Sequence, residues 1–198
     1  PHSVTGNRGI DPSKAFATYL RINHRLPMMT GGGAATRAAF KDIVAPFDLI
    51  LFDAYGVLNV GETAIPGAAA TVTALRAAGK SVAVVSNSAA YPKARMMARY
   101  ATLGFDFAPS EVVTSREALL QRIAREPRLR WGVMLNPDSD MGEIAALDTV
   151  ILTDAPADYD LVDGFLLIGA DGWTERRQKL LEASLARAPR PVFVGNPD

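Results

Sequence analysis

The stretch Leu51-Phe52-Asp53-Ala54-Tyr55-Gly56-Val57-Leu58 decides the fold of this 198-residue chain. Asp53 ends the apolar run of residues 49–52, which predicts a buried strand covered on both faces. Open α/β sheets bind ligands just outside the carboxyl ends of their strands. A carboxylate there can attack an electrophile or bind a divalent cation. An Asp that only caps the turn before Gly56 is the simpler interpretation of this segment taken alone.

The segments that follow repeat the same alternation of strand and helix. Short apolar runs rich in β-branched residues predict strands, and Pro and Gly mark the ends of the helices between them. This order is typical of a parallel α/β sheet. The predicted strands are residues 49–52, 81–85 and 111–113, and the helices run from about Pro66 to Gly79 and from Tyr91 to Gly104.

A second group of strands and helices is expected in the rest of the chain. Ser115 is the predicted N-cap of a helix that runs to about Arg125. Asp11 caps another predicted helix close to the N-terminus, with Pro12 at its first position. The further predicted strands are residues 132–135, 149–152, 164–168 and 191–194, with a helix between the last two.

A second polar strand end lies at Val84-Val85-Ser86-Asn87. The hydroxyl of Ser86 and the backbone N–H groups after it could hold a phosphate oxygen near the start of the next helix. Ser and Asn are also good turn and cap residues, so a plain strand-to-helix turn is the alternative. Two such strand ends in consecutive units favour a site over two unrelated turns.

Together these segments resemble the haloacid dehalogenase superfamily, in its subfamily of the N-acetylglucosamine-phosphatase and phosphoglycolate/pyridoxal-phosphatase type. The resemblance covers the chain from about residue 47 onward. It implies a Rossmann-like parallel sheet core in residues 47–117 and an inserted α/β cap domain in residues 118–198, after an N-terminal extension of residues 1–46. It rests on Asp53 to Leu58, Gly61, Pro66-Gly67-Ala68, Val84 to Asn87, Thr114-Ser115 and Asn196-Pro197-Asp198.

The resemblance implies a covalent phosphatase mechanism on a small phosphorylated molecule. Asp53 would attack phosphorus and form an aspartyl-phosphate, and Ser86 would hydrogen-bond the transferring phosphoryl group. Mg²⁺ would be held by the Asp53 carboxylate and the backbone carbonyl of Tyr55. Metal and donors would neutralise the charge on the phosphoryl oxygens. Gly56, Asn87 and Asp198 are the residues expected to contact substrate or phosphate.

Tyr55 departs from the pattern of these phosphatases, which carry a second Asp there as general acid and base. Phenols lose their proton only near pH ~10, so a Tyr is a poor general base at neutral pH. Asp-x-Tyr-Gly is the form found in metal-independent 2-haloacid dehalogenases, although Val57 stands where those enzymes have Thr. Three functions therefore stay open: a Mg²⁺-dependent phosphatase, a dehalogenase, and a catalytically impaired binding protein.

The family's later motifs, a Lys and an acidic pair, would follow the segment that matches Asn196-Pro197-Asp198. We therefore expect the sequence to be part of a longer protein.

Composition excludes several other classes of function. The 21 basic and 21 acidic residues balance, which gives no electrostatic footprint for a nucleic acid. The chain has no cysteine, which excludes disulfides, zinc thiolate sites and cysteine nucleophiles and fits a cytoplasmic protein. No apolar stretch is long enough to predict a membrane span. A homodimer is compatible with all of these features.

Overall fold

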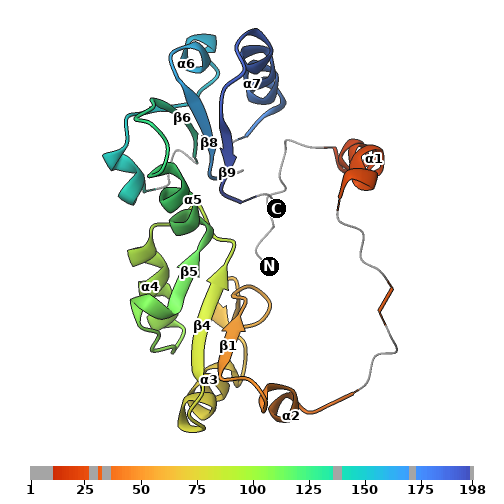
Figure 1. Cartoon of the computed structure of the whole chain (residues 1–198), viewed down its shortest axis with the longest axis vertical. Helices are drawn as coiled ribbons and strands as arrows, with labels where there is room; N and C mark the ends of the chain where they lie inside the picture. Colours follow the sequence, from red (N-terminus) through yellow and green to blue (C-terminus); the bar gives the residue numbers. More distant parts are fainter. Residues whose placement is uncertain (1–10, 27–30, 33–36, 136–139, 170–172, 197–198) are drawn as a thin grey trace.

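The computed structural model describes residues 11–26, 31–32, 37–135, 140–169 and 173–196. Two parallel sheets follow one another along the chain, and Figure 1 shows them as two separate units, one above the other, each with its own helices. The α/β class predicted from the sequence is confirmed. Asp198, one of the candidate site residues, lies outside the described residues.

The first sheet has the strand order β1-β4-β5, and all of its pairings are parallel. Both crossovers lead in the same direction across the sheet, so the right-handed rule puts their helices on the same face. Val72, Leu75, Met96 and Tyr100 from these helices belong to one buried core with the strands. The elements are β1 (Leu49–Phe52), α3 (Ala68–Ala77), β4 (Ser81–Ser86), α4 (Lys93–Thr102) and β5 (Val112–Thr114).

The other face of this sheet corrects one prediction from the sequence. Leu51 is 59% exposed and Val85 47%, while their strand neighbours Phe52 and Val84 are buried. The continuous apolar run of β1 predicted cover on both faces. In the part of the chain that the structure describes, both helices of the sheet lie on one side, because the two crossovers share a direction.

A small hairpin follows β1 and was not predicted. β2 (Asn59–Val60) pairs antiparallel with β3 (Thr63–Ala64). Gly56 precedes it with φ +81°, a left-handed conformation that L side chains rarely adopt. The chain therefore turns back on itself directly after the end of β1.

The second sheet has the order β7-β6-β8-β9 and is also parallel throughout. Its crossovers run in both directions, so apolar cores form on both faces. Trp131 belongs to one core and Phe165 to the other. The elements are β6 (Trp131–Met134), η3 (Gly142–Ala146), β7 (Thr149–Ile151), α6 (Pro156–Asp160), β8 (Gly164–Leu167), α7 (Glu175–Arg187) and β9 (Val192–Val194).

Helix α5 (Ser115–Ile123) leads from β5 to the second sheet. Its N-cap is Thr114 and not the predicted Ser115: the Thr114 hydroxyl accepts a hydrogen bond from the N–H of Glu117, whose carboxylate accepts from the N–H of Thr114. This reciprocal capping box needs Glu at the third helical position, which suits Thr114.

The remaining helices lie before the first sheet or within its connections. α1 (Pro12–Ile22) begins as predicted, because the Asp11 carboxylate accepts from the N–H of Ser13 at 2.9 Å. Figure 1 shows this helix apart from both sheets, and its apolar side chains Phe16 and Tyr19 are exposed. The others are η1 (Asn23–Arg25), α2 (Phe40–Val44) and η2 (Pro109–Glu111).

Candidate active site

The two residues with the main predicted catalytic roles lie at the ends of two neighbouring strands. Asp53 follows β1 and Ser86 ends β4, and the two strands pair in parallel with Phe52 beside Val84. The carboxyl ends of both strands therefore lie at the same edge of the sheet, where open α/β folds bind ligands.

The turn after β1 fixes the position of Asp53. The carbonyl of Ala54 accepts hydrogen bonds from the N–H groups of Leu58 and Asn59, at 2.9 and 3.1 Å, and the N–H of Gly56 donates to the carbonyl of Asn59 at 2.8 Å. One carboxylate oxygen of Asp53 accepts from the N–H of Ala54 at 2.7 Å. The side chain of Asp53 is exposed, so its second oxygen is accessible to a reactant.

A hollow of about 280 Å³ opens at this edge of the sheet. The structure brings three predicted residues, Tyr55, Ser86 and Asn87, together in its wall, whereas Asp53 and Gly56 do not line it. The immediate neighbour of Asp53 does line it. The full lining is Ala54, Tyr55, Asn59, Ser86, Asn87, Ser88, Met96 and Arg99.

Ser86 is buried at 6% exposure, and the neighbouring loop fixes its hydroxyl oxygen. That oxygen accepts a hydrogen bond from the N–H of Ser88 at 3.2 Å. A Ser hydroxyl has one proton to donate and accepts through its lone pairs. The N–H of Ser88 occupies a lone pair and not the proton, so the hydroxyl can still donate to an oxygen atom in the hollow.

Arg99 is a residue of this site that the sequence analysis did not single out. Its guanidinium contacts the hairpin, through the carbonyl of Gly61 and the carboxylate of Glu62 at 3.2 Å. Its Nε is buried and has no hydrogen-bond partner among the residues that the structure describes. An arginine one position before Tyr100 carries no motif, so only the fold brings its charge to the hollow.

Tyr100 is a buried residue of α4 in the same region, within the helix that the sequence predicted from Tyr91 to Gly104. Its phenolic oxygen is near Ser86, but among the described residues it forms no hydrogen bond of good geometry. Burial raises the pKa of Tyr100, the charge of Arg99 and the Ser86 hydroxyl oppose this, and the Asp53 carboxylate adds to it. The hydroxyl of Tyr100 is thus a buried polar group close to Ser86.

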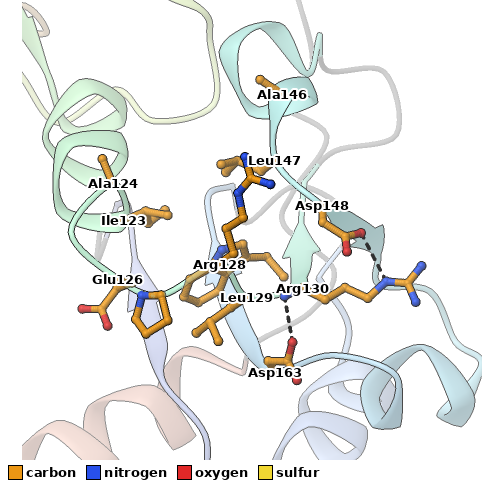
Figure 2. A pocket seen from close by; sticks show the side chains of 12 residues that line it. Ile123, Ala124, Glu126, Arg128, Leu129, Arg130, Ala146, Leu147, Asp148 and Asp163 are labelled. Atoms are coloured by element: carbon orange, nitrogen blue, oxygen red, sulfur yellow. Dashed lines mark hydrogen bonds and ion pairs between the residues drawn. The ribbon is translucent and has the colours of Figure 1, made fainter.

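A larger hollow, of about 550 Å³, lies at the amino ends of the strands of the second sheet (Figure 2). Trp131, Asp148 and Asp163 in its lining stand where β6, β7 and β8 begin. Its charges are largely paired: Arg130 contacts the Asp148 carboxylate at 3.3 Å, and its N–H donates to Asp163 at 2.9 Å. Because it lies at the amino ends of the strands, we do not assign the predicted chemistry to it.

Comparison with known proteins identifies the family. Residues 50–146, which include both strand ends and the start of the second sheet, match the family described as haloacid dehalogenase-like hydrolase. The match covers just under half of the chain. The resemblance inferred from the sequence motifs is thereby confirmed.

Two of the curated relatives that match this chain are chronophin and glycerol-3-phosphate phosphatase. Bovine (Bos taurus) chronophin is 34% identical over 110 residues, which are 56% of this chain and 35% of chronophin. Glycerol-3-phosphate phosphatase of Rattus norvegicus is 42% identical over 65 residues, 33% of this chain and 20% of the relative. The matches thus span about a third or less of the length of these relatives.

The fold of the chain is also found among solved structures. NagD from E. coli K-12 superposes with a TM-score of 0.57 at 22% identity, over 76% of this chain and 57% of that one. At this identity the likeness shows the shared fold. No helix in the described part of the chain is long and apolar enough to cross a membrane.

The oxygen donors for a metal ion are few in the described residues. No group of three or more His, Cys, Asp or Glu side chains gathers there. Asp53 supplies one exposed carboxylate, with one oxygen held by the N–H of Ala54. Mg²⁺ commonly binds one or two protein carboxylates and takes its other ligands from water and substrate phosphate. The Asp53 carboxylate at the end of β1 fits a Mg²⁺ site of this kind, in which the protein supplies only a few of the ligands.

Proposed function

We propose that this protein is a phosphoric monoester hydrolase that acts on a small phosphorylated metabolite through an aspartyl-phosphate on Asp53. The observation that supports this most is the placement of Asp53 and Ser86 at the ends of paired parallel strands. A carboxylate nucleophile and a hydroxyl donor at one sheet edge can act on the same phosphoryl group. The carboxylate would attack phosphorus, and the hydroxyl would donate a hydrogen bond to a phosphoryl oxygen.

In the proposed reaction, a carboxylate oxygen of Asp53 attacks phosphorus, and the bond from phosphorus to the ester oxygen breaks. The leaving oxygen accepts a hydrogen bond from the hydroxyl of Tyr55, which lines the hollow, and takes its proton from solvent. Water then attacks the phosphorus of the aspartyl-phosphate, which releases phosphate and the Asp53 carboxylate. This water gives its proton to solvent, so the cycle balances with one ester and one water consumed. Ser86 donates its proton to a phosphoryl oxygen in both steps.

Mg²⁺ belongs to the same proposal, with the Asp53 carboxylate and the backbone carbonyl of Tyr55 as its protein ligands. When bound, such an ion neutralises charge on the phosphoryl oxygens. The side chains of Asn87 and Arg99 in the hollow wall would bind the remaining charge and polar groups of the substrate. Gly56 would permit the turn that aims Asp53, and Asp198 would contact substrate from the other side.

The division of the chain belongs to this proposal as well. The first sheet, in residues 47–117, would be the catalytic core. The second, in residues 118–198, would be the cap that covers the substrate, with residues 1–46 as an extension. Glycerol-3-phosphate phosphatase is by its name an enzyme of a small phosphate ester, which supports that substrate class. The absence of cysteine favours a cytoplasmic location.

A metal-independent 2-haloacid dehalogenase is the second candidate. The observation in its favour is Tyr55, which is 66% exposed and lines the hollow at the position where the resembling phosphatases have Asp. In that reaction the Asp53 carboxylate would displace halide from carbon, and water would hydrolyse the resulting ester.

The test compares wild type with Asp53→Asn and Tyr55→Asp, each with p-nitrophenyl phosphate and 2-chloropropionate, with Mg²⁺ or with a chelator. We expect slow, Mg²⁺-dependent phosphatase activity in the wild type and none in Asp53→Asn. Chloride release that ignores the chelator would favour the dehalogenase. A folded full-length protein that turns over neither substrate would leave only the third function, a binding protein.

A further inference from the structure

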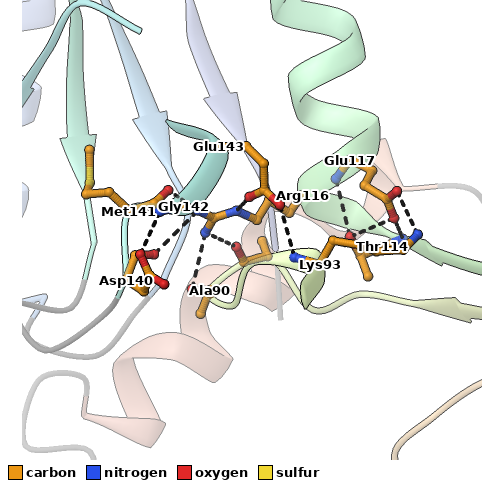
Figure 3. A network of polar contacts seen from close by, with 10 residues as sticks. Ala90, Lys93, Thr114, Arg116, Glu117, Asp140, Met141, Gly142 and Glu143 are labelled. Atoms are coloured by element: carbon orange, nitrogen blue, oxygen red, sulfur yellow. Dashed lines mark hydrogen bonds and ion pairs between the residues drawn. The ribbon is translucent and has the colours of Figure 1, made fainter. Parts of the chain in front are cut away.

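Arg116 is a buried cation between the two sheets. The residue is 1% exposed and follows the N-cap of α5, the helix that leads from the first sheet to the second. Figure 3 shows its guanidinium at the centre of a network of polar contacts. A buried charge of this kind is costly unless its donors are paired.

One side of the network holds the loop that continues from Ser86. The guanidinium donates to the carbonyls of Ala89 and Ala90, at 3.2 and 3.3 Å, and the backbone N–H of Arg116 donates to the carbonyl of Ser88 at 3.4 Å. The N–H of Ser88 in turn donates to the Ser86 hydroxyl oxygen at 3.2 Å. Two consecutive hydrogen bonds therefore connect the backbone of Arg116 to the hydroxyl at the end of β4, and the guanidinium holds the next two residues of the same loop.

The other side of the network holds the segment that leads into η3. The guanidinium donates to the carbonyls of Asp140 and Met141, and its Nε lies 3.1 Å from the Glu143 carboxylate. The contacts of Arg116 thus include three carbonyls of the first unit and three acceptors of the second.

Two further contacts hold the same segments together. The N–H of Lys93, at the start of α4, donates to the second carboxylate oxygen of Glu143 at 3.2 Å. Gly142 packs so closely on Pro92 that a Cβ there would come within 2.7 Å of the proline ring. Because the packing is this close, we expect Gly142 and Pro92 to be either in contact or apart, and not to slide gradually past one another.

We propose that Arg116 is a positioning residue that ties the loop behind Ser86 to residues 140–143, and so sets the Ser86 hydroxyl and the orientation of the second sheet together. The kinetic part of this inference rests on the proposed phosphatase function. The orientation part does not, because it concerns only how the two sheets are held.

The orientation is measured with a pair of spin labels on the whole 198-residue chain, which has no cysteine of its own. Ala101→Cys on α4 and Ala183→Cys on α7 place both labels at exposed sites, one in each unit. Arg116→Met should broaden and shift the distance distribution. Arg125→Met is the matched control, because Arg125 is an exposed arginine directly after the same helix. An unchanged distribution in a folded Arg116→Met protein would overturn the proposal.

If Arg116→Met does not fold, Arg116→Lys and Glu143→Gln decide the question. Each keeps part of the network, so each should broaden the distribution less, and an unchanged distribution in both would overturn the proposal.

Kinetics with p-nitrophenyl phosphate add a second readout on the full-length protein. Arg116→Lys should lower kcat by between about tenfold and a hundredfold with little change in KM, as for a displaced catalytic group. A full wild-type kcat would show that Arg116 does not position Ser86. An inactive wild type with the expected label distances would count against the phosphatase and not against the tie between the units.

Discussion

Gly56 offers the sharpest test of how the turn after β1 aims Asp53. Its φ of +81° lies in the left-handed region, yet a Cβ built there would meet no atom within 4 Å. Gly56→Ala should therefore cost only backbone conformational energy, about 1–2 kcal/mol for an L residue. The stiffer unfolded chain returns about 0.4–1 kcal/mol of this. We expect a net loss of about 1 kcal/mol, which lowers Tm by about 2–4 °C in a protein of this size.

Gly79 provides the matched control, because its φ is +77° and its surroundings are equally open. Gly79→Ala should lower Tm as much as Gly56→Ala, since the strain is the same. Only Gly56→Ala should also reduce phosphatase activity, because only that turn carries Asp53. Gly56→Asn should recover part of the stability, since Asn tolerates the left-handed region. Thermal unfolding and p-nitrophenyl phosphate assays check both effects. Equal losses of activity in the two alanine variants, or an unchanged Tm in Gly56→Ala, would refute the reasoning.

Three other substitutions have defined outcomes. Tyr55→Asp should raise phosphatase activity, because a carboxylate can take a proton from water at neutral pH; a lower rate than wild type would contradict this. Tyr100→Phe should leave the stability unchanged or raise it by up to about 1 kcal/mol in a denaturant titration, because the buried hydroxyl lacks a well-formed hydrogen bond; a large loss would disprove that. For Glu143, burial alone would raise the pKa, but hydrogen bonds from its own N–H and that of Lys93 and the charge of Arg116 outweigh it, so the pKa lies below its ordinary value of 4.5. Its contribution to stability is then complete above pH 4.5 and lost as the pH falls through the lower folded value. Glu143→Gln should flatten that part of an acid unfolding curve, and an unaltered curve would contradict the pairing.

The regular elements of the fold were largely predictable from the sequence. The bounds of β1 agree with the apolar run of residues 49–52, and Asp11 caps α1 as expected. Both signals are local, since they depend on side-chain pattern and on one side chain reaching a nearby N–H. The hairpin of β2 and β3 was missed because strands of two residues have no periodicity to detect.

The candidate site was predictable only in part. Tyr55, Ser86 and Asn87 were found because polar residues at strand ends carry a recognisable signal, and the structure gathers them in one hollow. Arg99, Tyr100 and Arg116 were missed because their roles arise from tertiary packing. Arg116 in particular reads as an ordinary helix-surface residue in sequence, yet it is 1% exposed. The roles of Asp53 and of the other site residues stay predictions.

The most direct test of the central claim is to locate the phosphoryl group on the enzyme. Full-length protein is mixed with p-nitrophenyl phosphate and Mg²⁺, quenched in acid and mapped by peptide mass spectrometry. Slow breakdown, expected with Tyr55 in place of a carboxylic acid, should let the intermediate accumulate. Asp48→Asn, which removes an exposed carboxylate at the opposite end of β1, serves as the control. We predict one phosphoryl group on Asp53 in the wild type and in Asp48→Asn, and none in Asp53→Asn. Phosphorylation of a different residue, or turnover by Asp53→Asn, would contradict the account.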